Sequence, residues 1–149
     1  MALPTLLIAS DHAGFELKRE IQKQMTHVTW LDLGPANSDR VDYPDFAEKL
    51  GKSLNGGNAS LGILICGSGI GMSIAANKIP GIRAATVENP SAARLAREHN
   101  DANVLCLGAR FIAPEYAVEM IQGWMNAQFA GGRHAGRVDK MKKLEEKFT

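Results

Sequence analysis

Three glycines stand at alternate positions directly after an apolar run, in the segment Cys66-Gly67-Ser68-Gly69-Ile70-Gly71. Glycines between a strand and a helix leave backbone N–H groups free to face an anion. The segment is not a P-loop, because no Gly-Lys-Ser/Thr follows it, and its glycine spacing differs from that of dinucleotide-binding loops. It therefore predicts an anion site of another kind, and a plain tight turn is the alternative interpretation.

The two cysteines stand in different surroundings. Cys66 ends the apolar run beside the glycine loop, whereas Cys106 lies inside the apolar run 104–107. The positive end of the following helix and nearby cations would favour the thiolate form of Cys66, which makes it a candidate base or nucleophile. An inert buried cysteine is the alternative for Cys66, and we expect Cys106 to be core. Two cysteines exclude a disulfide-rich scaffold and a cysteine metal cluster.

Further side chains suited to acid–base chemistry or anion binding fall where apolar runs or predicted helices end. Asp11 and His12 follow the first apolar run, and His99 ends a predicted helix just before the fifth predicted strand. Arg133 and Arg137 are four residues apart and share one helix face. Two guanidinium groups on one face suit a phosphate or a carboxylate, and solvated arginines are the alternative.

Short apolar runs alternate with helix-like stretches along the chain. The expected strands are 6–9, 28–33, 61–66, 83–87 and 104–107, and the expected helices are 15–25, 42–54, 72–78, 91–99, 114–129 and a last one after Gly131-Gly132. Continuous apolar strands separated by helices are typical of a parallel sheet covered on both faces. We therefore predict one doubly wound α/β domain over residues 1–149, with about five strands in a three-layer αβα arrangement and ligands at the carboxyl ends of the strands.

The last helix, in residues 131–149, is one more than a five-stranded sheet needs. Its apolar residues at helical spacing must cover either the chain's own core or another subunit. Residues 133–149 also hold six basic and three acidic side chains, so basic charge is concentrated there. The apolar stripe consists of Val138, Met141, Leu144 and Phe148.

Composition limits the classes of function. The 149 residues carry a formal net charge of +1, and 45% are hydrophobic and 22% charged, which is ordinary for a globular domain. This charge gives no reason to expect nucleic acid or an anionic membrane as a partner. The N-terminus lacks the basic start of a signal peptide, and no apolar run approaches the ~20 residues of a membrane span. We therefore expect a cytoplasmic protein.

Stretches spread over nearly the whole chain, in order and at matching spacing, are similar to one known family. They are Ser10-Asp11-His12-Ala13-Gly14-Phe15, Asp42-Tyr43-Pro44, Ile65 to Gly71, Ala75-Ala76-Asn77-Lys78, Gly81-Ile82-Arg83-Ala84, Arg97-Glu98-His99-Asn100, Asn103-Val104-Leu105, and Gly131-Gly132-Arg133-His134 with Arg137. On these stretches the chain resembles the type B ribose-5-phosphate isomerases, which share a superfamily with the two-subunit galactose-6-phosphate isomerases.

The resemblance implies roles for single residues. Cys66 resembles the base that moves a proton between carbons 1 and 2 of the sugar, and His99 resembles the acid–base group that opens the furanose ring. One branch of the family has glycine and glutamate where this chain has Cys66 and Met72, so the chain follows the cysteine branch. The residues that resemble substrate contacts, with the arginines facing the phosphate, are Asp11, His12, Gly67, Ser68, Gly69, Ile70, Gly71, Asn100, Arg110, Arg133 and Arg137.

The resemblance also implies an activity and an assembly. The activity is the interconversion of D-ribose 5-phosphate and D-ribulose 5-phosphate through an enediolate, in the non-oxidative branch of the pentose phosphate pathway, without metal or cofactor. The assembly is a homodimer whose sites are built from both subunits, and pairing of dimers into tetramers stays open. A hexose 6-phosphate isomerase for allose or galactose 6-phosphate and a non-catalytic sugar-phosphate-binding module are the alternatives, and the glycine spacing ranks a nucleotide-binding protein below them.

Overall fold

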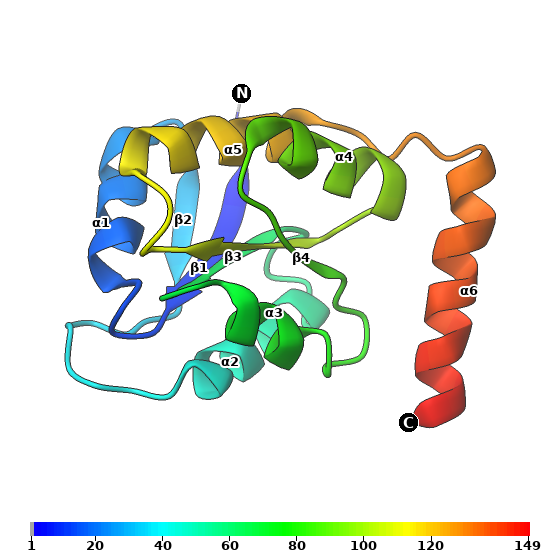
Figure 1. Ribbon diagram of the computed structural model, residues 1–149, viewed down its shortest axis with the longest axis horizontal. Coiled ribbons are helices and arrows are strands. Elements are labelled where there is room, and N and C mark those ends of the chain that lie inside the picture. The colour runs from blue at the N-terminus through cyan, green and yellow to red at the C-terminus, as the bar shows by residue number, and fades with distance from the viewer. Residues whose placement is uncertain (1) are drawn as a thin grey trace.

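The structure, a computed structural model, describes residues 2–149 as strands and helices in alternation around one sheet (Figure 1). The strands are β1 (Thr5–Ser10), β2 (Thr29–Asp32), β3 (Gly62–Cys66), β4 (Ala84–Thr86) and β5 (Val104–Gly108). The helices are α1 (Phe15–Gln24), α2 (Tyr43–Asn55), α3 (Ile70–Ala76), α4 (Pro90–Asn100), α5 (Pro114–Asn126) and α6 (Arg133–Phe148). The predicted elements are confirmed, with ends that differ by a few residues.

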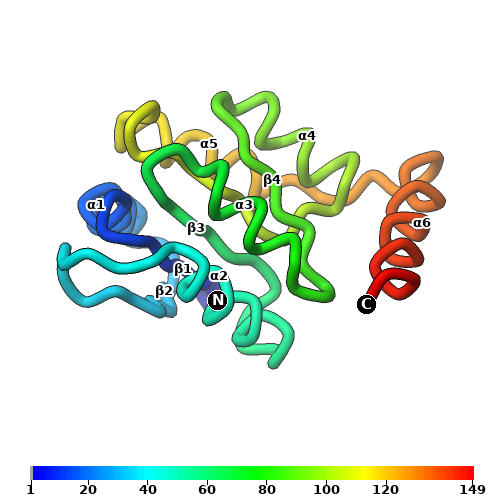
Figure 2. Tube along the Cα trace, turned by 60° about the horizontal axis from the view of Figure 1, so that its bottom comes forward, coloured from blue at the N-terminus to red at the C-terminus, as the bar shows by residue number. Residues whose placement is uncertain are grey.

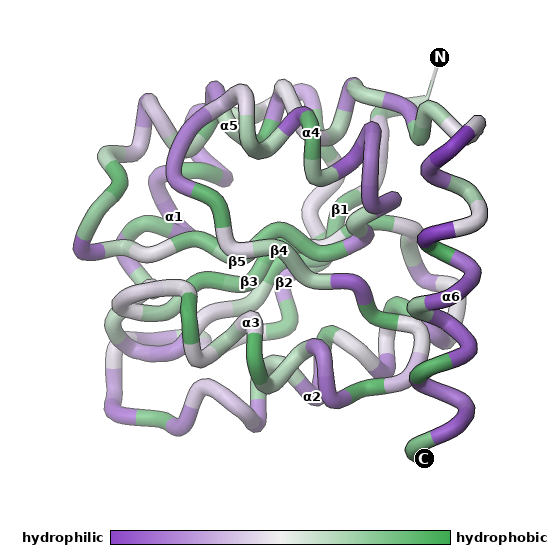
Figure 3. The backbone as a smooth tube through the Cα atoms, turned by 45° about the vertical axis from the view of Figure 1, so that its right-hand side comes forward, coloured by the Kyte–Doolittle hydropathy of each residue, from purple (hydrophilic) through white to green (hydrophobic). Residues whose placement is uncertain are grey.

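The sheet is parallel throughout and its strand order is β2-β1-β3-β5-β4. Helices α1, α4 and α5 cover one face, and α2 and α3 cover the other, as Figure 3 shows from the side. This arrangement confirms the doubly wound, three-layer α/β fold. All carboxyl ends of the strands therefore lie along one edge of the sheet, and all amino ends lie along the opposite edge.

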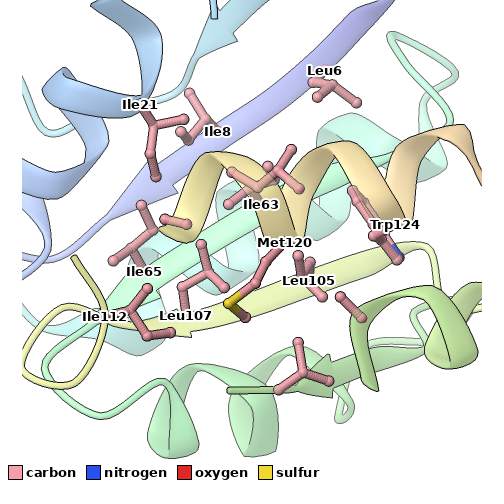
Figure 4. Packing of buried hydrophobic residues seen from close by; sticks show 14 of the residues in the cluster. Leu6, Ile8, Ile21, Ile63, Ile65, Leu105, Leu107, Ile112, Met120 and Trp124 are labelled. Carbon is pink, nitrogen blue, oxygen red and sulfur yellow. The ribbon is translucent and has the colours of Figure 1, made fainter. Parts of the chain in front are cut away.

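The central strands are buried on both faces, which explains their continuous apolar runs. Leu6 and Ile8 of β1 pack on the side of α5, whereas Leu7 and Ala9 pack on the side of α2. Figure 4 shows the α5 side, where Trp124 covers the sheet, and the Trp124 indole N–H donates to the Ala102 carbonyl at 3.1 Å. Each such aliphatic side chain stabilises the fold by about 1.5–3 kcal/mol when fully buried.

Helix α4 has defined ends, which fixes the residues at its last turn. The Asn89 side chain caps the first turn by accepting from the Ala92 N–H at 2.8 Å, and Pro90 follows it. Asp101 ends the helix in the left-handed conformation, with a φ of 49°. Its carboxylate pairs with Arg97 at 2.9 Å and with Arg83 at 3.2 Å. The end of α4 is therefore tied to Arg83, the residue directly before β4.

Helix α6 stands apart at one end of the molecule in Figures 1 and 2. It follows Gly131 and Gly132, and only His134 and Val138 among its residues are buried. The rest of its apolar stripe is uncovered, because Met141, Leu144 and Phe148 are 40%, 56% and 79% exposed. Of the four residues of the stripe, Val138 alone is therefore buried against the chain's own core.

Within residues 2–149, no helix combines the length and the apolar character needed to cross a bilayer.

Candidate active site

A pocket of about 370 Å³ opens at the carboxyl edge of the sheet. Cys66 stands at its base, at the end of β3 and opposite Gly108 of β5. The volume is within the range of small-molecule sites. The pocket is lined by Asp11, His12, Ala13, Tyr43, Cys66, Gly67, Ser68, Ile70, Gly71 and Arg110. It therefore brings together the predicted residues that follow the first, third and fifth strands.

The glycine loop folds back over the Cys66 thiol. Gly69 has a φ of +78°, and its backbone N–H donates to Cys66 Sγ at 3.1 Å. A Cβ at Gly69 would lie 2.9 Å from the Leu107 carbonyl carbon, so no other residue fits this turn without displacing β5. The hydrogen bond places a backbone dipole on the sulfur, where it stabilises a negative charge.

Arg110 supplies positive charge to the same pocket. Its guanidinium lies over Gly67, since a Cβ built on Gly67 would be 2.9 Å from Arg110 Cζ. Two backbone hydrogen bonds hold this turn, from the Ala109 N–H to the Cys66 carbonyl at 2.9 Å and from the Arg110 N–H to the Gly67 carbonyl at 3.0 Å. The cation and the thiol are thus held by one turn.

Asp11 and His12 form the opposite wall of the pocket. Asp11 is buried, and its carboxylate accepts from the Gly14 N–H at 3.0 Å at the start of α1. His12 Nδ1 lies 3.1 Å from the carbonyl oxygen and 3.3 Å from the nitrogen of Val41. The Val41 backbone therefore holds the imidazole in either tautomer, and Nε2 is left for another partner.

Tyr43 belongs to the pocket although sequence reasoning assigned it no role. It is the first residue of α2, and a Cβ on Gly71 would lie 2.8 Å from its hydroxyl oxygen. The phenol therefore sits against the glycine loop, where it can donate or accept a hydrogen bond. The signal in the sequence was the Asp42-Tyr43-Pro44 stretch, which reads as a helix start.

The remaining predicted residues form a second group, at the end of α4 and the start of α6. We call His99, Asn100, Arg133, His134 and Arg137 the His–Arg cluster. The imidazoles of His99 and His134 stack with ring centroids 4.2 Å apart and planes 12° apart. Burial lowers the pKa of His134, and His99, Arg133 and Arg137 lower it further. The sequence alone assigned no role to His134.

Within one chain, the His–Arg cluster lies far from Cys66. Helix α4 runs back from the carboxyl end of β4 to the amino end of β5, so His99 and Asn100 lie at the amino edge of the sheet. Figure 1 shows α6 beyond that end of α4, away from the loop between β3 and α3. The thiol pocket and the His–Arg cluster are therefore at opposite edges of the sheet.

Two further residues singled out in the sequence are in the core. Cys106 is buried between β3 and β4, and burial raises the pKa of its thiol, with a smaller contribution from Cys66. The prediction of a core residue is confirmed. Met72 is also fully buried, on the α2 side of the sheet. Among residues 2–149, histidine, cysteine and carboxylate side chains form no group of three suited to a metal ion.

Known proteins are similar to this chain in sequence. The ribose-5-phosphate isomerase B of Escherichia coli K12 is 44% identical over 139 residues, which cover 92% of this chain and 93% of that protein. A probable ribose-5-phosphate isomerase B of Mycoplasma pneumoniae is 48% identical over 141 residues, covering 91% of each. Others are named only as putative sugar phosphate isomerases, such as YwlF of Bacillus subtilis at 44% identity.

Two solved structures are similar over almost their full length. Ribose-5-phosphate isomerase B of Clostridium thermocellum has a TM-score of 0.94 and 46% identity, over 97% of this chain and 99% of that one. The Mycoplasma genitalium enzyme with bound ribulose-5-phosphate has a TM-score of 0.89 and 41% identity, over 97% of each. The model of the Ribose/Galactose Isomerase family matches residues 6–141. The chain belongs to the ribose/galactose isomerase family.

Proposed function

We propose that this protein is an aldose–ketose isomerase that interconverts D-ribose 5-phosphate and D-ribulose 5-phosphate. The observation that carries the proposal is the Cys66 thiol, which accepts a hydrogen bond from the Gly69 N–H in a pocket that also holds Arg110. A base next to fixed N–H donors and a cation suits a reaction that creates an oxyanion. Relatives named as ribose-5-phosphate isomerase B support the choice of sugar.

The reaction needs one base and a site for one negative charge. Cys66, as the thiolate, removes the proton from carbon 2 of the open-chain aldose, and the C2–H electron pair forms the C1–C2 double bond while negative charge moves onto O1. The N–H groups of the Gly67–Gly71 loop that are not used within the loop stabilise this enediolate. Cys66 then returns the proton to carbon 1, and the proton of the 2-hydroxyl moves to O1, which leaves the ketose.

The His–Arg cluster supplies the groups for phosphate binding and ring opening, which the thiol pocket lacks. Arg133 and Arg137 bind the phosphate and hold the sugar through a part that does not react. His99 opens the furanose ring of the aldose, and Asn100 binds a sugar hydroxyl beside it. Asp11, His12 and Arg110 contact the sugar from the pocket side.

We propose that the cluster of one subunit completes the pocket of another, in a homodimer. Large exposed apolar side chains occur near both regions, and surfaces of this kind mark subunit contacts. Beside the pocket, Ile70, Ile74 and Phe111 are 56%, 59% and 64% exposed, and the uncovered stripe of α6 is the second surface. Residues 131–149 would then pack on the partner subunit.

The cellular setting follows from the substrate and the thiols. Interconversion of these two pentose phosphates is a step of the non-oxidative branch of the pentose phosphate pathway. Cys66 and Cys106 are both unpaired, and unpaired thiols persist in the reducing cytoplasm. We therefore place the enzyme in the cytoplasm.

A substrate panel tests the activity. Purified protein is incubated with ribose 5-phosphate, allose 6-phosphate and galactose 6-phosphate, and ketose formation is measured, with Cys66→Ala as the control. We expect the highest kcat/KM for ribose 5-phosphate and a kcat lower by about 10³-fold for Cys66→Ala. A higher kcat/KM for a hexose phosphate would make the protein a hexose isomerase, and binding of all three without product would make it a binding module.

A further inference from the structure

We propose that His134 is a positioning residue for the ring-opening step, holding the His99 imidazole by stacking on its face. The inference rests on the proposed isomerase activity and assigns it a residue for which neither the motif nor the pocket gives a role. The two rings belong to the same chain and stack on each other. They therefore enter the same active site, whichever subunit's Cys66 that site contains.

The stack is held from both sides by backbone contacts. The His134 N–H donates to the Gly131 carbonyl at 3.0 Å, which fixes the first turn of α6. The Ala130 N–H donates to the Glu98 carbonyl at 2.9 Å, which ties the segment before α6 to the last turn of α4. His134 is buried although most of α6 is exposed. His134 and Val138 are thus the two buried side chains of α6, and the Glu145 carboxylate of the same helix accepts from the Gly81 N–H at 3.0 Å.

The charges around the stack favour a neutral His134. Burial, His99, Arg133 and Arg137 all lower the pKa of His134. A neutral imidazole can lie against a protonated one as an aromatic ring lies against a cation, whereas two imidazolium rings 4.2 Å apart would repel each other. A neutral His134 therefore keeps a favourable contact with His99 throughout the proposed ring-opening step.

Ring opening is the step that depends on this geometry. The C1–O4 bond of the furanose breaks, O4 gains a proton, and the 1-hydroxyl loses its proton to become the aldehyde. His99 gives the proton to O4 and is restored by the proton released from the 1-hydroxyl. The ketose forms no such ring, because the oxygen on its carbon 5 carries the phosphate. A displaced His99 ring would therefore slow ring opening and leave proton transfer at carbon 2 intact.

The test compares His134→Ala with His134→Phe, which keeps a flat ring at the position. Turnover is measured with ribose 5-phosphate and with ribose 5-phosphate deuterated at carbon 2. We expect His134→Ala to lower kcat about 10- to 100-fold, with a smaller change in KM and an isotope effect no larger than that of the wild type. His134→Phe restores most of kcat. Lys143→Ala, an exposed change on the same helix, keeps the wild-type values.

The isotope effect separates this role from others. A rise in the isotope effect of His134→Ala would mean that proton transfer at carbon 2 had slowed, and would overturn the inference. So would an unchanged kcat, or a His134→Phe variant no faster than His134→Ala. A wild-type enzyme without turnover of ribose 5-phosphate would overturn the proposed function and this inference with it.

Discussion

The thiol pocket and the His–Arg cluster are built in different ways. The pocket is made by backbone: a left-handed Gly69, an N–H bonded to the Cys66 sulfur, and the turn that carries Arg110. The cluster is made by side chains at the ends of two helices, one of which is largely exposed. In the proposed mechanism, proton transfer between carbons 1 and 2 occurs at the sheet edge, whereas ring opening by His99 and phosphate binding by Arg133 and Arg137 depend on the ends of α4 and α6. Removing a group from the pocket should therefore affect kcat, and removing an arginine from the cluster should mainly affect binding.

Loss of the Cys66 thiol gives the largest expected effect. Cys66→Ala removes the proposed base and should lower kcat about 10³-fold, within the usual range for an acid–base group. Steady-state kinetics measures kcat, and circular dichroism verifies that the fold is kept. Cys106→Ala, the matched control in the core, should leave kcat near the wild-type value while lowering thermal stability. Near-normal turnover by Cys66→Ala would remove the thiol from the mechanism.

On the cluster side, Arg137→Ala should act on KM. Loss of one charge-assisted contact to the phosphate costs about 1.5–3 kcal/mol, which raises KM about 10- to 100-fold. The measurement is KM for ribose 5-phosphate, with Lys143→Ala as a control that removes a positive charge from the same helix. A fall in kcat with an unchanged KM would contradict the division between the two regions.

Gly69→Ala tests whether the pocket depends on its backbone. The substitution puts a Cβ 2.9 Å from the Leu107 carbonyl carbon at a φ of +78°, and we expect a loss of about 1–3 kcal/mol in the free energy of unfolding together with a fall in kcat. Gly57 is the matched control, because it also has a positive φ but a Cβ added there would have no atom within 4 Å. Gly57→Ala should lose stability and keep kcat. Equal kcat losses in both variants would show that the strain acts globally.

The smallest expected effect is on the pH dependence of stability. Because the folded state lowers the pKa of His134 below its ordinary value of 6.5, the unfolded chain binds more protons there as the pH falls. This contribution to stability is complete above about pH 6.5 and is lost at lower pH. Urea unfolding between pH 5 and pH 8 should show a steeper loss in the wild type than in His134→Phe. Parallel curves would mean that His134 titrates as it does in the unfolded chain.

Local sequence was enough to predict the sheet and most of the pocket. Residues 62–66 and 104–108 are buried on both faces, so their continuous apolar runs indicate strands directly. A glycine-rich segment between a strand and a helix can adopt few structures other than a tight turn. Tyr43 was missed because its contact with Gly71 depends on how α2 packs against α3. Tyr43 and Gly71 are far apart in the sequence, so no local sequence pattern predicts their contact.

The cluster was harder to place for a different reason. Each of its residues belongs to a recognisable motif. The edge of the sheet at which a helix ends, however, depends on the direction of that helix, which a motif does not give. The stripe of α6 likewise shows that one face is apolar but not what covers it. Only the structure shows that Val138 is covered by the chain itself and that Phe148 is not.

The central claim is that the pocket of one subunit works with the cluster of another. Cys66→Ala and His99→Ala variants, each inactive alone, are mixed under conditions that exchange subunits, and mixed dimers are counted by native mass spectrometry. Each mixed dimer would hold one site with both groups intact, so the mixture should regain about one quarter of the wild-type activity. Mixed dimers that stay inactive would contradict the claim.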